Sequence, residues 1–204
     1  TSKLGPLSAL MLPLARVQYQ RNRISEAETT LREAIALARR ANIPDILWSA
    51  YLALADVLYA RGEMHEAEAT LTQAHSYARG YHSPMMASFI GATLARNMLR
   101  IGQLDTARTW ALQYQSMGKV GYQQDYERLI LTRVWRAQGE YEQALTLLAQ
   151  LIADAQLEGR ISTVVVAEML RALVYHANGE TDLALTALEK SLILAHPQGI
   201  VRLF

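Results

Sequence analysis

The sequence of 204 residues predicts an all-α solenoid built from five stacked helix pairs. The period of this repeat is about 40 residues. Three observations lead to this fold class. A turn residue recurs at nearly constant spacing, and small residues recur at constant offsets on either side of it. The composition is also that of a folded globular chain, with 51% hydrophobic residues, 19% charged residues and a formal net charge of +1.

The turn residues set the repeat. They are, in order, Asn22, Gly62, Gly102, Gly139 and Gly179, so that each is separated from the next by about 40 residues. Glycine suits a tight connection between two helices because it accepts left-handed backbone angles, and asparagine is the next best residue there. Each of these positions is therefore expected to end one helix and lead directly into the next.

Small residues flank every turn. Seven residues before it stand Ala15, Ala55, Ala95, Thr132 and Ala172, and five residues after it stand Ala27, Ala67, Ala107, Ala144 and Ala184. Two antiparallel helices approach closely only where their side chains are small, so these positions are expected at the helix crossing. Acidic residues follow each turn, where a carboxylate interacts favourably with the dipole of the second helix; they are Glu26, Glu66, Asp105, Glu142 and Asp182.

The helix pairs follow one another along the whole chain. We expect repeats over residues 7–42, 45–82, 84–118, 122–158 and 162–196, within a single repeat domain that covers residues 1–204. Residues 7–15 are apolar, but the run is far too short to cross a bilayer, so we interpret it as the start of the first helix. One pair cannot bury its apolar face alone, whereas stacked pairs share a continuous core.

The bulk features limit the classes of function. Cysteine is absent, which fits a reducing cytoplasm and leaves no disulfide or thiolate chemistry. A net charge of +1 disfavours non-specific binding to nucleic acid. The sequence begins at Thr1 without methionine and stops at Phe204 directly after an apolar run, so we expect it to be a piece of a longer protein.

Catalytic and metal-binding motifs are not found. The segment HEAEA at residues 65–69 lacks the second histidine of a helical zinc site, and His82 falls in a breaker-rich loop seven residues after His75. Neither a G-x-S-x-G nucleophile turn nor a G-x-x-x-x-G-K-[ST] phosphate loop occurs. We therefore expect no enzyme activity, no metal and no cofactor in this chain.

The repeat resembles the tetratricopeptide pattern, in which small residues meet at the helix crossing and a glycine lies between them. Its period of about 40 residues is similar to that of the long-helix variant found in the sensor region of large ATP-dependent LuxR-type transcriptional regulators, typified by the maltose-regulon activator. The segments LREAIALARRANI and ALTALEKSLILAHPQGIVRLF carry this resemblance, which includes Pro197, Gly199, Arg202 and Phe204 in the second of them.

The resemblance implies a right-handed superhelix and a role in bacterial, cytoplasmic signal sensing. An ATPase module would precede this region and a helix-turn-helix DNA-binding domain would follow it, so ATP is expected only in the missing upstream module. The partners implied are a small-molecule effector or a peptide, the other domains of the parent regulator, and a second copy through controlled self-association. Direct nucleic-acid binding and membrane association are not expected of this chain.

In tetratricopeptide superhelices the first helix of each pair lines the concave groove. Carried over to this sequence, the groove residues are Arg16, Tyr19, Asp56, Tyr59, Arg96, Arg100, Arg133, Arg136 and His176, with Phe89 and Tyr126 beside them. Arginine suits carboxylates and phosphates, and tyrosine offers a flat face and a hydroxyl. The alternative is that these side chains are solvated, with Asp56 paired to a neighbouring arginine.

Two other functions compete with effector sensing. The first is a scaffold that holds a protein or peptide segment in the groove, as many tetratricopeptide arrays do. The second is a peptide-pheromone receptor of the helical-repeat type, whose period is similar to the one found here.

Overall fold

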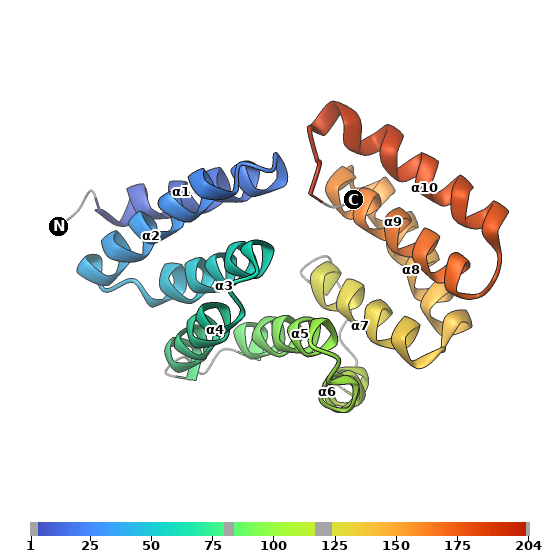
Figure 1. The fold of residues 1–204 in the computed structure, drawn as a ribbon, viewed down its shortest axis with the longest axis horizontal. Coiled ribbons are helices and arrows are strands. Elements are labelled where there is room, and N and C mark those ends of the chain that lie inside the picture. The colour runs from blue at the N-terminus through green and yellow to red at the C-terminus, as the bar shows by residue number, and fades with distance from the viewer. Residues whose placement is uncertain (1–3, 80–83, 117–123, 203–204) are drawn as a thin grey trace. The chain divides into compact units, whose positions relative to one another are not determined.

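The computed structural model describes residues 4–79, 84–116 and 124–202. These residues form ten α-helices and no strand (Figure 1). The helices are α1 (Leu4–Gln20), α2 (Ile24–Ala41), α3 (Pro44–Arg61), α4 (Met64–Arg79), α5 (Pro84–Arg100), α6 (Leu104–Ser116), α7 (Asp125–Gln138), α8 (Tyr141–Leu157), α9 (Ile161–Ala177) and α10 (Thr181–Ala195). A short 3₁₀ helix, η2, spans His196–Gln198.

The predicted helix pairs are confirmed. The odd-numbered helix of each pair is called the A helix below and the even-numbered helix the B helix. All five predicted turn residues have a left-handed backbone, with φ of 61° at Asn22 and 81° at Gly62, for example. The loop predicted around His82 lies, up to Ser83, outside the described residues.

The chain divides into two compact units. The first unit contains residues 1–87 and 199–204, and the second contains residues 88–198. The single domain expected over residues 1–204 stays a prediction.

In the first unit, α1 packs on α2, α2 on α3, and α3 on α4. The small residues at the predicted crossings are buried, because Ala27, Ala55 and Ala67 each expose none of their surface. Leu31 and Leu58 fill the space between the helices and are 1% and 0% exposed. Close helix crossings at alanine, with larger side chains beside them, therefore form this core as the repeat predicted.

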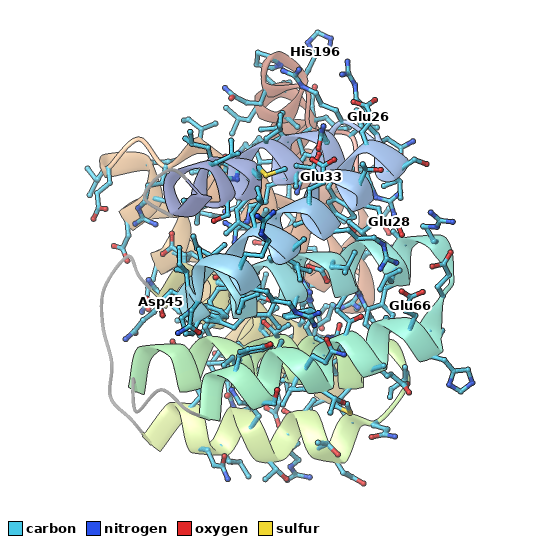
Figure 2. The ribbon with its side chains drawn as sticks, turned by 90° about the vertical axis from the view of Figure 1, so that its left-hand side faces the viewer. Glu26, Glu28, Glu33, Asp45, Glu66 and His196 are labelled. Carbon is cyan, nitrogen blue, oxygen red and sulfur yellow. The ribbon has the colours of Figure 1, made fainter. Side chains whose placement is uncertain are left out.

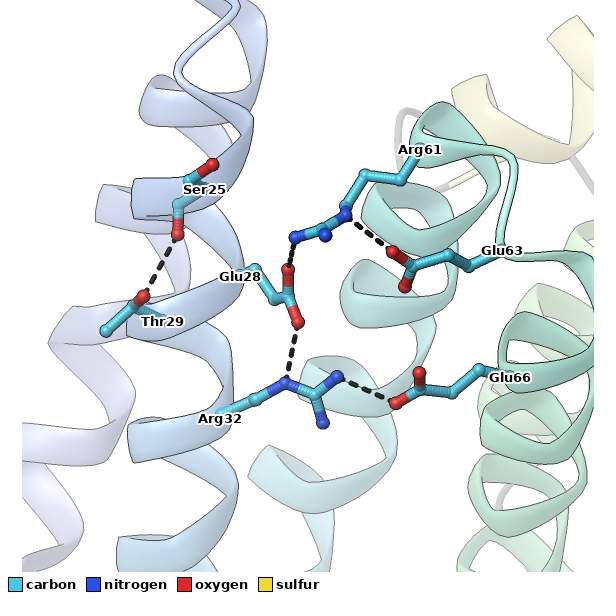
Figure 3. A network of polar contacts seen from close by, with 7 residues as sticks. All are labelled: Ser25, Glu28, Thr29, Arg32, Arg61, Glu63 and Glu66. Carbon is cyan, nitrogen blue, oxygen red and sulfur yellow. Dashed lines mark hydrogen bonds and ion pairs between the residues drawn. The ribbon is translucent and has the colours of Figure 1, made fainter.

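A polar network joins the outer edges of α2, α3 and α4 (Figure 3). The carboxylate of Glu28 pairs with both Arg32 and Arg61. Arg32 also reaches Glu66 at 2.7 Å, and Arg61 reaches Glu63 at 2.8 Å. Figure 2 shows Glu28 and Glu66 on the same side of these helices. Alternating charges therefore link three successive helices.

In the second unit, two hydrophobic clusters form the core. One combines residues of α5, α6 and α7, such as Ala95, Ala107 and Val134. The other combines residues of α7, α8 and α9, and Trp135 packs against both clusters. The A helices α5, α7 and α9 are thus neighbours in the order of the sequence.

Carboxylates are also buried in this unit. Asp125 accepts a hydrogen bond from Thr163 at 2.9 Å and pairs with Arg160, which ties the start of α7 to the start of α9. Glu168 is 3% exposed and pairs with Arg171 at 2.6 Å. Burial raises the pKa of Glu168, and the positive charges of Arg171 and Lys190 oppose that rise. Sequence reasoning did not identify these carboxylates as buried.

Among the helices that the structure describes, none combines the length and the hydropathy that crossing a membrane requires.

Candidate functional site

All nine predicted groove residues lie on A helices. Five belong to the second unit: Arg96 and Arg100 on α5, Arg133 and Arg136 on α7, and His176 on α9. The other four belong to the first unit: Arg16 and Tyr19 on α1, and Asp56 and Tyr59 on α3. The A helices therefore divide the predicted site into two sets.

In the second unit, one of these residues, Arg96, lies against an aromatic pair. The guanidinium of Arg96 lies over the ring of Tyr126, 5.7 Å from its centre. The other aromatic residue, Phe89, stacks on Tyr126 with ring centres 4.5 Å apart. The hydroxyl groups of Thr93 and Tyr126 are 3.2 Å apart, within hydrogen-bonding distance. Tyr126 is therefore held in place by three residues of α5.

Arg133 stands among the other arginines. Burial lowers the pKa of Arg133 to about 10, and the charges of Arg96, Arg100 and Arg136 act in the same direction, while Tyr126 opposes them. We call Arg96, Arg100, Arg133 and Arg136 the arginine cluster. Partial burial and neighbouring positive charges both disfavour the charged form of this guanidinium, and the approach of an anion would offset the effect of those charges.

Hydrogen bonds orient part of the cluster. Arg133 donates from Nη1 to the carbonyl oxygen of Leu129, 3.1 Å away and one turn earlier in α7. Nε of Arg136 is buried, and no acceptor for it is found among the described residues. That N–H group is a donor suited to a carboxylate or phosphate oxygen, which guanidinium groups bind strongly.

His176 is not part of this cluster. It is exposed on α9, and the groups that shift the pKa of Arg133 come from α5 and α7. Phe89 and Tyr126, by contrast, were found by the register and lie at the centre of the site. Thr93 was missed, because its role depends on the position of Tyr126 on another helix.

The predicted residues of the first unit are arranged differently. Arg16 is exposed, whereas Asp56 and Tyr59 are partly buried on α3. The guanidinium of Arg202 covers the ring of Tyr19 at 5.1 Å and donates a hydrogen bond to Asn22 at 2.9 Å. One face of Tyr19 is therefore occupied by a residue of the chain itself.

A cleft of about 420 Å³ lies between α5 and α6. Its lining consists of Gly91, Leu94, Ala95, Asp105, Thr106, Thr109, Trp110 and Gln113. A Cβ atom on Gly91 would stand 2.9 Å from the indole of Trp110, so only glycine permits this packing. At the positions equivalent to Gly91 in the second and fourth repeats, the residues are Tyr51 and Arg128. The missing side chain at Gly91 therefore makes room for the indole of Trp110, and none of the predicted groove residues lines the cleft.

The described residues hold no group of three or more His, Asp or Glu side chains that could bind a metal ion. The side chain of His75 and the whole of His82 lie outside what the structure describes. Catalytic residues were not predicted, and no catalytic constellation is assigned.

Solved structures with a similar arrangement of helices support the fold. A putative kinesin light chain of Podosopora anserina with nearly identical TPR-like repeats aligns with a TM-score of 0.57 and 22% identity, over 97% of this chain and 99% of that one. BtubC (BKLC) from P. vanneervenii aligns with a TM-score of 0.62 and 18% identity, over 96% of this chain and 82% of that one. These likenesses show the fold, which is an all-α solenoid of tetratricopeptide-like helix pairs.

The family is shown by a match over almost the whole sequence. Residues 2–204 match the model of the MalT-like TPR region, and the chain belongs to this family. The resemblance inferred from the repeat is thereby confirmed. No curated protein matches the chain.

Proposed function

We propose that this chain is the effector-sensing region of an ATP-dependent, LuxR-type bacterial transcription activator, and that it binds a small anionic molecule at the arginine cluster. Membership of the MalT-like TPR family supports the parent regulator. The site is carried by the charges of Arg96, Arg100 and Arg136, which lower the pKa of Arg133, together with the position of Arg96 over Tyr126 and the buried Nε of Arg136. The region binds and does not catalyse, and ATP and DNA are handled by other modules of the regulator.

The chemistry of the cluster selects the effector. Arg133 is partly buried beside three further positive charges, and a carboxylate or phosphate group would offset their effect on it. The planar guanidinium groups favour oxygen pairs in one plane. The ring of Tyr126, stacked on Phe89, holds the guanidinium of Arg96 in place and so helps to orient one of the arginines. A phosphorylated sugar or a small di- or tricarboxylic acid combines these features.

The position of the cluster suggests how binding becomes a signal. Arg96 lies on α5 and Arg133 on α7, which belong to successive helix pairs. An anion held by both helices favours one angle between those pairs over others, and a ligand shifts a conformational equilibrium by its difference in affinity for the two states. In the parent regulator this shift controls ATP-dependent self-association.

A thermal-shift screen with isothermal titration calorimetry tests the proposal. The probes are inorganic phosphate, sugar phosphates, di- and tricarboxylic acids, neutral sugars and short peptides. We expect at least one class of anion to raise the melting temperature, because a ligand that binds only the native state stabilises it. Affinity should fall as salt concentration rises, since partly exposed charges are screened.

Variants locate the site. Arg133→Ala and Arg136→Ala should each weaken binding of that anion about tenfold or more, since each removes charge-assisted hydrogen bonds. Arg108→Ala is the matched control, because Arg108 is exposed on the B helix α6. Equal affinity in Arg133→Ala and Arg108→Ala would refute the site. A shift with peptides alone would instead support the scaffold function.

A further inference from the structure

The cleft between α5 and α6, within the second unit, is opposite in charge to the arginine cluster. Among the residues that line it, Asp105 is the single charged side chain, and none is basic. Its other polar groups belong to Thr106, Thr109 and Gln113 on α6, whereas its wall on α5 is apolar. A volume of about 420 Å³ lies within the range of small-molecule sites. The cleft therefore combines an apolar wall, hydroxyl and amide groups, and one negative charge.

An exchange of side-chain size between the two helices fixes Trp110 in this cleft. In the second repeat, the position of Gly91 holds Tyr51 and that of Trp110 holds Thr70. The third repeat therefore takes its large side chain from the B helix instead of the A helix. The indole lies with one edge against Gly91, where a Cβ atom would stand 2.9 Å away, and it stacks on Tyr114 with ring centres 5.3 Å apart. Trp110 is thus an aromatic part of the cleft wall that is held on two sides.

The carboxylate of Asp105 gives the cleft its negative charge. It is exposed, and in the described part of the chain no arginine or lysine forms an ion pair with it. In the first unit, by contrast, Glu28 and Glu66 are both paired with Arg32. The hydroxyl of Thr109 donates to the backbone carbonyl oxygen of Asp105 at 3.0 Å, so the lone pairs of the hydroxyl oxygen remain as acceptors. Asp105 and Thr109 therefore suit a ligand that donates hydrogen bonds.

We propose that this cleft binds a small organic ammonium ion, whose apolar body lies against Leu94 and Trp110. The ammonium group pairs with the carboxylate of Asp105 and donates a hydrogen bond to the hydroxyl oxygen of Thr109. An indole attracts cations more strongly than the other aromatic side chains do. The carboxylate disfavours anions, so the cleft does not compete with the arginine cluster for its ligand. The two sites are independent, and this one does not rest on the anionic effector proposed above.

Nuclear magnetic resonance of the indole groups tests this binding. The chain has 3 tryptophans, and the resonance of Trp110 is the one that disappears in Trp110→Phe. Three probes share one body and differ in charge: phenethylammonium, 2-phenylethanol and 3-phenylpropanoate. We expect the ammonium ion to shift the Trp110 resonance to saturation, to leave those of Trp48 and Trp135 in place, and to bind about threefold or more tightly than the alcohol. The absence of a shift, or equal binding of the alcohol or the carboxylate, would overturn the proposal.

Two matched variants locate the charge that binds. Asp105→Asn should weaken binding of phenethylammonium about threefold or more, and added salt should reduce this difference. The substitution keeps the size of the side chain, and circular dichroism melts establish that each variant folds. Asp182→Asn is the control, because Asp182 is exposed and stands in the first turn of the B helix α10, as Asp105 does in α6. Unchanged affinity in Asp105→Asn, or an equal loss in Asp182→Asn, contradicts the assignment.

A blocked tripeptide with a central lysine distinguishes a free amine from a peptide side chain. We expect it to bind more weakly than phenethylammonium, because a small cleft excludes the flanking peptide groups. Tighter binding of the tripeptide would assign the cleft to a peptide partner and overturn the proposal. Since the probes are cations and the signal comes from Trp110, failure here is distinct from failure of the anion site.

Discussion

Arginines serve two purposes in the two units of this molecule. In the first unit, the carboxylates of Glu66 and Glu28 accept hydrogen bonds from Arg32 and raise its pKa. In the second unit, burial and neighbouring arginines lower the pKa of Arg133 to about 10. The charged form of Arg32 in the first unit is thus favoured by its surroundings, whereas the charged form of Arg133 in the second unit is disfavoured.

This contrast separates a structural network from a candidate site. The network around Glu28 is built from charges of both signs that pair across three helices (Figure 3). Partly exposed pairs of this kind contribute little to stability, about 0 to 1 kcal/mol each. In the arginine cluster, by contrast, the like charges of Arg96, Arg100 and Arg136 disfavour the charged form of Arg133. Sites that perform a function are often stabilised less than the fold allows.

The largest expected effect is a loss of stability when a buried alanine is enlarged at a helix crossing, a feature that both units share. Ala67 in the first unit and Ala144 in the second are both fully buried at a helix crossing. Ala67→Leu and Ala144→Leu should each lower the free energy of unfolding by about 1 to 3 kcal/mol, because a larger side chain overpacks the crossing. Chemical denaturation measures this change. Ala153→Leu, at an exposed position of α8, is the control, and melting as cooperative as the parent in Ala67→Leu would contradict the register.

The next largest expected effect tests the contrast between the arginine cluster and the Glu28 network by replacing one arginine of each. Arg133→Met should raise the free energy of unfolding by about 1 kcal/mol, since it replaces a partly buried charge, repelled by neighbouring arginines, by an apolar side chain of similar length. Arg32→Met should lower it by less than about 1 kcal/mol, because solvent screens the pairs that it removes. Both are measured by thermal denaturation in a buffer free of multivalent anions, which would occupy the cluster. A loss of stability in Arg133→Met would assign this arginine a structural role.

The smallest effect is a difference in pH dependence between Glu28 and Glu168. Partial burial acts to raise the pKa of Glu28, but Arg32 and Arg61 bring it below the ordinary value of 4.5. Its ionised form therefore stabilises the native state above pH 4.5, and this contribution is lost as the pH falls through the native pKa. The raised pKa of Glu168 has the opposite consequence: ionisation costs stability at neutral pH, and the cost disappears as the pH falls through its native pKa.

Glu28→Gln and Glu168→Gln separate these two cases. As the pH falls from neutral towards about 4, the stability of the parent relative to Glu28→Gln should decrease, by less than about 1 kcal/mol. Over the same pH range, the stability of the parent relative to Glu168→Gln should increase. Urea denaturation at a series of pH values gives both differences, and parallel trends in the two variants would refute the contrast.

Much of the site follows from the repeat register. Because each A helix presents the same face at the same offsets, the register by itself placed Arg96, Arg133 and Arg136 on one surface. It did not separate His176 from them, since register gives the face of a helix and not the distance between side chains. It also did not reveal that Arg202 covers Tyr19, because these residues stand near opposite ends of the sequence.

The sequence by itself determined the all-α fold, the helix pairs and the turns, because glycine or asparagine at each turn and a small residue at each crossing act locally and recur five times. Only the tertiary structure decided which charges are paired and which are crowded together. Coulomb interactions and desolvation depend on the distance between side chains from different helices, and on how much water surrounds them. The arginines of the cluster and those of the Glu28 network cannot be told apart in the sequence. Only their packing makes one set a candidate site and the other part of a structural ion-pair network.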